Sequence, residues 1–320
     1  MQRRSVLRAA AAAAAAPALV RAQGAWPNRP VRLVVPFGAG GATDIIARLI
    51  SQKLSELWGQ SVVVDYKPGA GTVLGTDFTA KSAPDGYTMG MVITAHVINP
   101  SLRPSMPFDT LRDLSGVSLV AVSHIMLAAT PSLPASNIRE LIALAKKEKL
   151  AYATPGTGTA MHLAGELLKS MTGIDITHVP YKGGAAAYPD VIAGRVPLLL
   201  DPMFASIGHV KAGRMKAIAI TSAERAASNP EIGTVAEAVP GFDVKSISGV
   251  VVPSATPREI VRRASADIGR VLAMPDVRAR MAEVGMEPAA NSPEAFDAFI
   301  RREIERWAPV VKASGAKAAD

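Results

Sequence analysis

Three glycine-rich segments of this chain have the residue types that can bind an anion. Residues 34–44 read VVPFGAGGATD, residues 68–75 read PGAGTVLG and residues 153–162 read ATPGTGTAMH. In each, β-type residues lead into a glycine loop and then into a helical pattern. Backbone amides at a helix N-terminus bind anions, and the helix dipole favours the negative charge. Glycine lets the backbone approach such a ligand closely because it has no Cβ.

Polar side chains stand beside these loops. Asp44 falls in the first turn of a helix, where a carboxylate either caps a free amide or contacts the ligand, and both roles stay open. Thr157 and Thr159 can donate hydroxyl hydrogen bonds. His162 either donates to the ligand or is a buried histidine bonded to the backbone. A hydrogen bond to a charged group contributes roughly 1.5–3 kcal/mol, so a few could hold a small carboxylate at micromolar strength.

Nucleotide binding is poorly supported. A phosphate loop needs lysine and then Ser or Thr after its last glycine, and residues 42–43 are Ala-Thr. Residues 68–75 nearly match the dinucleotide fingerprint, with one residue too many before the last glycine and no acid at the end of the next strand. Thr72 is better explained as a second wall of the same crevice, since ligands gather at the carboxyl ends of parallel strands. We therefore expect no cofactor.

Catalytic and metal-binding signatures are missing from the sequence. It has no Gly-x-Ser-x-Gly elbow, no His-Glu-x-x-His pair and no cysteine, and its five histidines are scattered. We expect no catalytic residue and no metal site, and the prediction is that the chain is not an enzyme.

The positioning elements follow from the hydrophobic pattern. Apolar β-type runs alternate with segments whose apolar residues recur at helical spacing, which predicts parallel βαβ units. Expected strands are 31–36, 61–65, 87–94, 150–154, 175–179, 196–201 and 216–221. Expected helices are 43–57, 72–82, 138–149, 162–172, 257–273, 275–284 and 293–312.

Two apolar stretches, 117–130 and 242–253, are long for single strands. If both run from one lobe into the other, they form a hinge of two crossover strands. The expected fold is then α/β with two lobes, residues 23–124 plus 247–320 forming the first and residues 125–246 the second. A single large sheet is the alternative.

The first 22 residues are expected to be an export signal. Arg3, Arg4 and Arg8 precede a run of alanines and a small-residue cleavage site, and RRSVLR resembles a twin-arginine signal. A disordered N-terminus and a membrane anchor are weaker alternatives. With Arg21, these arginines account for four of the eight net positive charges, so cleavage would leave +4. No basic stripe with interleaved aromatics indicates nucleic acid binding.

The chain resembles the tripartite tricarboxylate transporter substrate-binding proteins, the TctC or Bug family, from about Trp26 to Val311. The matching stretches, specific in their order and spacing, are PVRLVVPF (30–37), GGATD (40–44), PGAG (68–71), PDGYT (84–88), GTGT (156–159), HLA (162–164), HVPYKG (178–183), TVAEA (234–238) and PGF (240–242).

This resemblance implies a type II periplasmic binding protein, a Venus flytrap that binds a small carboxylate such as a di- or tricarboxylate, an acidic amino acid or an aromatic acid. The implied partners are integral membrane permease subunits or a sensor kinase, and we expect a monomer. The implied ligand-binding residues are Phe37, Gly38, Gly40, Gly41, Thr43, Asp44, Thr157, Gly158, Thr159, His162, Lys182, Gly183 and Asp201, and Thr72 joins them from the second loop.

The sequence also departs from the family pattern. Residues 245–248 are KSIS, where an aromatic pair usually precedes the glycine matching Gly249. Residues 65–67 are DYK in place of Glu-Asn-Arg, and Ala186 replaces a frequent proline. Ligand size therefore does not follow from the resemblance. A transport receptor is the favoured function; a sensory receptor, and more remotely an exported enzyme, are the alternatives.

Overall fold

The computed structural model describes residues 26–39 and 42–318. The predicted export signal lies outside the described residues, as do Gly40 and Gly41 of the first glycine loop.

The described chain alternates strands and helices. The strands are β1 (Val31–Val35), β2 (Val62–Tyr66), β3 (Thr88–Ile93), β4 (Leu114–Ala129), β5 (Leu150–Thr154), β6 (Ile176–Pro180), β7 (Leu198–Pro202), β8 (Lys216–Ile220), β9 (Lys245–Pro253) and β10 (Glu287–Pro288). The helices are α2 (Ala42–Trp58), α3 (Val73–Ala80), α4 (Ala95–Leu102), α5 (Ile138–Ala145), α6 (Ala160–Thr172), α7 (Gly184–Ile192), α8 (Met203–Lys211), α9 (Arg258–Ala273), α10 (Pro275–Glu283) and α11 (Pro293–Ser314), with short 3-10 turns at Ala70–Thr72 and Val235–Glu237.

Sheet pairing confirms the predicted βαβ units. The strand order is β2-β1-β3-β9-β4-β7-β5-β6, with β8 and β10 paired to β4 off this path. β1 is parallel to β2 and β3, and β5 is parallel to β6 and β7. Because parallel strands end at the same edge, the loops after β1 and β2 share one edge of the sheet, and the loop after β5 lies at the corresponding edge of its own group.

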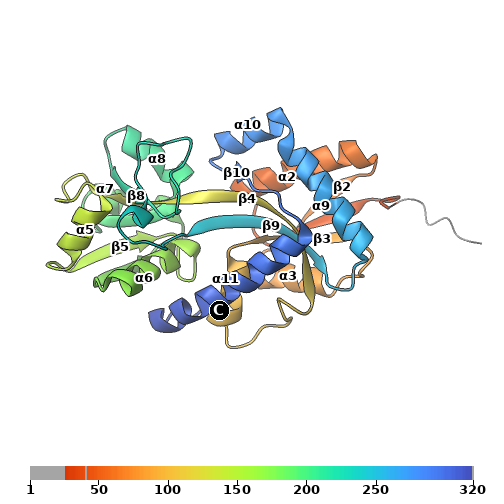
Figure 1. Ribbon diagram of the computed structural model, residues 1–320, viewed down its shortest axis with the longest axis horizontal. Coiled ribbons are helices and arrows are strands. Elements are labelled where there is room, and N and C mark those ends of the chain that lie inside the picture. The colour runs from red at the N-terminus through yellow and green to blue at the C-terminus, as the bar shows by residue number, and fades with distance from the viewer. Residues whose placement is uncertain (1–25, 40–41, 319–320) are drawn as a thin grey trace, which may run out of the picture.

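β4 connects two groups of strands, and β9 runs antiparallel beside it. β4 pairs with β9 as far as His124 and with β7 from Ile125 onward. We call β1, β2, β3, β9 and their helices the first half, and β5 to β8 with their helices the second half. Figure 1 shows the halves side by side, joined by these long strands. This is the two-lobe α/β fold that the sequence predicted.

Local capping explains where key helices begin and end. Thr159 caps α6 by accepting a hydrogen bond from the His162 amide, and Gly173 ends the helix at φ +69°. Ser292 caps α11 in the same way, with Pro293 at the first helical position.

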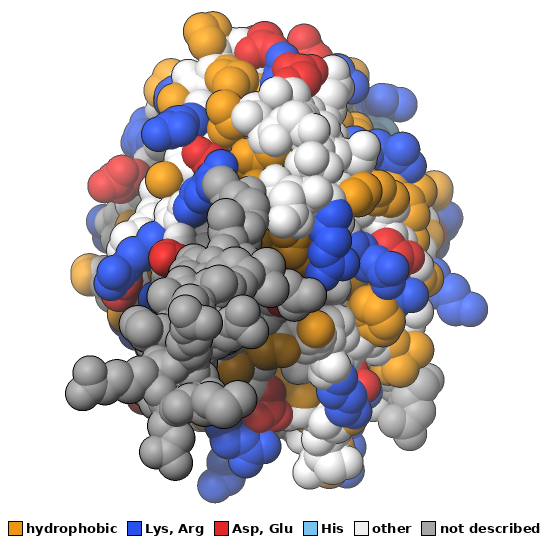
Figure 2. Space-filling view, turned by 90° about the vertical axis from the view of Figure 1, so that its right-hand side faces the viewer, with side chains coloured by type: hydrophobic (Ala, Val, Ile, Leu, Met, Phe, Trp, Pro, Cys, Tyr) orange, Lys and Arg blue, Asp and Glu red, His pale blue; other side chains and the backbone are white. Residues whose placement is uncertain are grey.

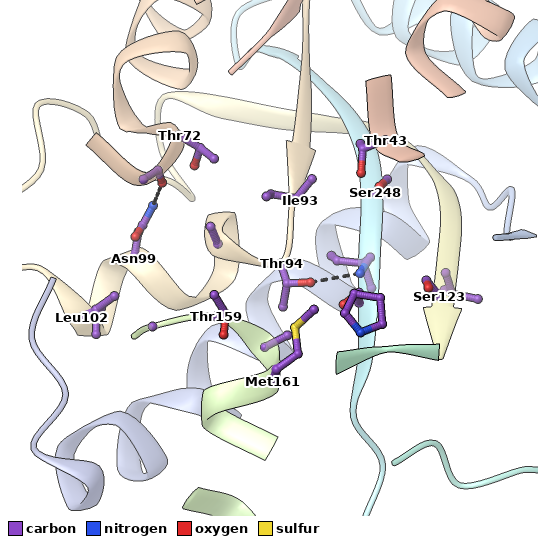
Figure 3. A pocket seen from close by; sticks show the side chains of 18 of the residues that line it. Thr43, Thr72, Ile93, Thr94, Asn99, Leu102, Ser123, Thr159, Met161 and Ser248 are labelled. Carbon is purple, nitrogen blue, oxygen red and sulfur yellow. Dashed lines mark hydrogen bonds between the residues drawn. The ribbon is translucent and has the colours of Figure 1, made fainter. Parts of the chain in front are cut away.

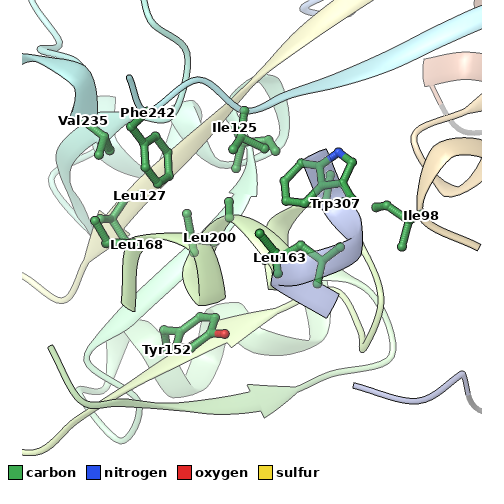
Figure 4. Close-up of a cluster of buried hydrophobic side chains, with 14 of the residues drawn as sticks. Ile98, Ile125, Leu127, Tyr152, Leu163, Leu168, Leu200, Val235, Phe242 and Trp307 are labelled. Carbon is green, nitrogen blue, oxygen red and sulfur yellow. The ribbon is translucent and has the colours of Figure 1, made fainter. Parts of the chain in front are cut away.

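α11 packs against both halves. It contacts α4 of the first half and α6 of the second. Trp307 of α11 is only 1% exposed, and in Figure 4 it lies near Ile98 of α4 and Leu163 of α6. These three residues belong to one hydrophobic cluster that extends across the junction. The helix therefore ties the halves together with apolar contacts.

Three helices were not predicted. α4 and α7 contain Pro100 and Pro189, which disfavour a helix interior, and α8 is nine residues long. Tertiary packing on the sheet overrides these weak local signals.

Charges are dispersed on the surface that Figure 2 shows, where Lys and Arg side chains lie among acidic and apolar ones. No helix in the described ranges is long and apolar enough to cross a membrane.

Candidate functional site

A cavity of about 440 Å³ lies where the two halves meet (Figure 3). Its volume is within the range of small-molecule sites. The first half lines it with the start of α2, the turn before α3, the β3–α4 junction and β9, and the second half with the start of α6 and the β7–α8 junction. The crossover strand β4 also contributes. The lining residues include Thr43, Thr72, Ile93, Thr94, Asn99, Leu102, Arg103, Ser123, Thr157, Gly158, Thr159, Ala160, Met161, Phe204, Ser246 and Ser248.

The first glycine loop reaches this cavity through Thr43. Asp44 is 3% exposed and accepts hydrogen bonds from Tyr66 Oη at 2.5 Å and from Arg48 Nε at 3.2 Å. Its carboxylate therefore links α2 to the end of β2. Phe37 packs against the core of the first half, and Gly38 is exposed. Neither lines the cavity.

The second glycine loop has an unusual backbone. Ala70 and Thr72 have φ angles of 46° and 81°, in the left-handed region that non-glycine residues seldom adopt. Asn99 of α4 holds this turn by donating from Nδ2 to the Gly71 carbonyl at 2.9 Å, a bond drawn in Figure 3. Such strain costs about 1–3 kcal/mol per residue and often marks a functional site. Here it places Thr72 in the cavity wall.

The third loop enters the cavity from the second half. Thr157, Gly158 and Thr159 all line it. The Gly158 amide, however, donates to Nδ1 of His162 at 3.1 Å, and the Thr159 hydroxyl donates to the Gly156 carbonyl at 2.8 Å. The Gly158 amide and the Thr159 hydroxyl therefore have partners inside the loop, whereas the exposed Thr157 hydroxyl makes no hydrogen bond within the described residues. The start of α6 offers further donors.

Two backbone donors at this helix start were missed by the sequence analysis. Ala160 and Met161 line the cavity, and their amides have no acceptor among the described residues. The first amides of any helix have no intrahelical acceptor, so an anion can bind them. Thr159 as a helix cap was the sequence signal that would have identified them.

His162 lies behind this loop and does not line the cavity. Its ring stacks on that of His178, with centroids 3.9 Å apart, and His178 Nε2 is 2.7 Å from Thr154 Oγ1. Burial, and then the charge of Lys169, lower the pKa of His162 to about 4, so the ring is neutral at pH 7. Of the two roles left open, the structure shows the bond to the backbone.

The remaining predicted residues gather near α7. Lys182 and Gly183 are exposed in the loop before this helix, where the Gly183 amide donates to the Pro155 carbonyl at 3.0 Å. Asp201, 1% exposed, lies one residue before the end of β7 and accepts a hydrogen bond from Tyr188 Oη at 2.8 Å. Burial raises the pKa of Asp201 to about 7. These three do not line the cavity; a ligand role for them stays a prediction.

Apart from Arg103, the rest of the described lining is apolar or weakly polar. Thr94 Oγ1 accepts a hydrogen bond from the Ile247 amide at 3.0 Å and fixes α4 to β9. Among the described lining residues none is acidic, which suits an anionic ligand. No group of His, Cys, Asp or Glu in the described ranges could hold a metal ion.

Two α/β halves joined by two crossover strands, with a cavity at their junction, define a two-lobe periplasmic-type binding protein. The family model described as "Tripartite tricarboxylate transporter family receptor" matches residues 46–316. The chain therefore belongs to this family of receptors, the TctC or Bug solute-binding proteins.

Known relatives agree with this assignment. The "UPF0065 protein in tcbD-tcbE intergenic region" of Pseudomonas sp. (strain P51) is 38% identical over 90% of this chain and 87% of its own length. The structure "R. palustris Rpa4515 with adipate" is 37% identical, with a TM-score of 0.78 over 91% of this chain and 99% of that one. "MatC (Rpa3494) from Rhodopseudomonas palustris with bound malate" is 29% identical, with a TM-score of 0.73 over 89% and 100%.

Proposed function

We propose that this protein is a periplasmic receptor that captures a small carboxylate and delivers it to the membrane subunits of a tripartite tricarboxylate-type transporter. The observation that carries the proposal is the start of α6, where the amides of Ala160 and Met161, unpaired within the described residues, open into a cavity whose described lining has no acidic side chain. Two similar proteins hold carboxylates, adipate and malate. Export through the predicted signal, residues 1–22, would bring the receptor to the periplasm.

We also propose the lobe limits predicted from the sequence, residues 23–124 with 247–320, and 125–246. The change of β4 pairing from β9 to β7 between His124 and Ile125 supports them. On this division, the turn containing Thr72 and the start of α6 belong to different lobes. A ligand touching both would then favour a closed arrangement.

Binding of a carboxylate is tested by titration calorimetry with a panel of di- and tricarboxylates, acidic amino acids and aromatic acids. At least one acid should bind with a dissociation constant in the micromolar range or below, and it should raise the melting temperature. Native mass spectrometry of freshly purified protein would identify an acid that co-purifies. A panel without binding or thermal shift would refute the ligand class.

Delivery is tested by deleting the gene and measuring uptake of the labelled acid that binds. Uptake should fall, and a copy of the gene should restore it. Normal uptake, with loss of a transcriptional response to the acid, would favour the sensory receptor instead. Conversion of the acid into a product by the purified protein would favour the exported enzyme.

A further inference from the structure

Arg103 is the only charged residue in the described lining of the cavity. It directly follows α4, where it caps the C-terminal end of the helix. All other described lining residues are uncharged. One guanidinium group therefore sets the charge of the cavity wall.

Within the described residues, the guanidinium group of Arg103 has no hydrogen-bond or ion-pair partner. Its Nε atom is buried and makes no hydrogen bond within the described residues. No carboxylate in that part of the chain forms an ion pair with Arg103, whereas Arg48, for example, pairs with Asp44. Arginine stays charged at any physiological pH and offers five N–H donors in a fixed planar fork. Buried polar groups are normally satisfied, so this donor set is available to a ligand.

Arg103 and its neighbour Leu102 lie close to the second and third glycine loops. A Cβ added to Gly71 would lie 3.0 Å from Arg103 Nη2, so the absence of a side chain at Gly71 makes room for the guanidinium group. A Cβ on Gly158 would lie 2.6 Å from Cδ2 of the neighbouring Leu102. Arg103 therefore lies beside the second glycine loop, and Leu102, the residue before it, lies beside the third glycine loop.

We propose that Arg103 selects ligands with two acidic groups by binding the second carboxylate of a short aliphatic dicarboxylate. This inference rests on the proposed function, in which the amides of Ala160 and Met161 hold the first carboxylate. A guanidinium fork matches a carboxylate in two parallel hydrogen bonds. Ile93, Leu102 and Met161 line the same cavity and would contact the methylene groups between the two carboxylates (Figure 3).

The test compares diacids with monoacids of equal chain length, using succinate with butyrate, glutarate with pentanoate and adipate with hexanoate. Calorimetry is run on the wild type, on Arg103→Met, and on Arg278→Met as a control. Arg278 is an exposed arginine of α10 that does not line the cavity. Arg103→Gln is measured in parallel, in case Arg103→Met does not fold.

For at least one pair, the wild type should bind the diacid about 10-fold or more tightly than the monoacid. Arg103→Met should weaken diacid binding by about 10- to 100-fold and leave monoacid binding unchanged. Arg278→Met should change neither. Unchanged diacid binding in Arg103→Met and Arg103→Gln, or equal losses for diacid and monoacid, would overturn the role of Arg103 while carboxylate binding stands. If the wild type bound neither these aliphatic acids nor any acid of the wider panel, the proposed function would be overturned as well.

Discussion

The amide of Gly158 donates to Nδ1 of His162, four residues further along the chain and 3.1 Å away. Nδ1 can accept this hydrogen bond only when it carries no proton. The glycine loop that borders the cavity is therefore held by a neutral imidazole, and its geometry depends on the protonation of a residue that does not line the cavity.

Acid should weaken the fold between pH 6.5 and 4. Burial lowers the pKa of His162, His178 and His96 to about 4, from an ordinary value of 6.5. In this interval the unfolded chain binds protons at these histidines that the folded chain does not, so stability falls as the pH falls. Asp201 acts in the opposite sense, because its raised pKa of about 7 lets the folded state hold a proton there. Burial also raises the pKa of Asp297, which acts in the same sense as Asp201, and lowers the pKa of His209, which acts with the other histidines, so the histidines outweigh the aspartates.

Urea unfolding at a series of pH values measures this dependence. His162→Asn is the matched variant, since an amide oxygen can still accept from Gly158 but does not titrate. It should show a shallower fall in the free energy of unfolding than the wild type. An identical slope would mean that His162 is not protonated on unfolding in this range.

Removing one backbone donor should weaken carboxylate binding. Ala160→Pro deletes the amide at the first helical position, where proline is well tolerated after an extended residue such as Thr159. The loss of a hydrogen bond to a charged ligand predicts about a 10-fold or greater rise in dissociation constant. Ala160→Val keeps the amide and adds similar bulk, so it controls for crowding at this buried position. Equal losses in the two variants would argue against the amide.

A side chain at Gly184 should destabilise the protein. An added Cβ would lie 2.2 Å from Oδ1 of Asp201, well inside van der Waals contact. Gly184→Ala is expected to cost about 1–3 kcal/mol, as other overpacked sites do. Gly208 lies within α8 and has open space around its Cβ position, so Gly208→Ala should instead stabilise by about 0.5–1 kcal/mol. Urea unfolding distinguishes the two, and a neutral Gly184→Ala would show that the Asp201 carboxylate can move aside.

Truncating Trp307 should loosen the junction of the two halves. This fully buried side chain joins α11 to the cluster that contains Ile98 and Leu163. Trp307→Ala is expected to lower the free energy of unfolding by about 3–5 kcal/mol, whereas Trp307→Phe keeps most of the apolar contact and should cost less. Hydrogen exchange would show faster opening of α11 in Trp307→Ala. A loss of less than 1 kcal/mol would contradict the role of this contact.

The amino-acid sequence alone determined the local units. Alternation of β-type and helical patterns predicted nine strands and seven helices close to their observed positions, because hydrophobic period and capping residues act over a few neighbours. The motifs also indicated the family and the strand-to-helix loops that include Thr72 and Thr157–Thr159. The short helices α4 and α7, which contain Pro100 and Pro189, were missed for the same reason, since only packing on the sheet offsets their poor local propensity.

The tertiary structure decided which donors are free. Residue types made Gly158, Thr159 and His162 look available, yet Gly158 and Thr159 both bond to His162 and the Thr159 hydroxyl donates to Gly156. The amides of Ala160 and Met161 have no acceptor within the described residues and are left for a ligand. Arg103 has no motif around it. It reaches the cavity only because α4 packs beside the turn at Gly71, a contact between residues distant in the chain. Availability of a polar group depends on every neighbour in space, and sequence spacing does not contain that information.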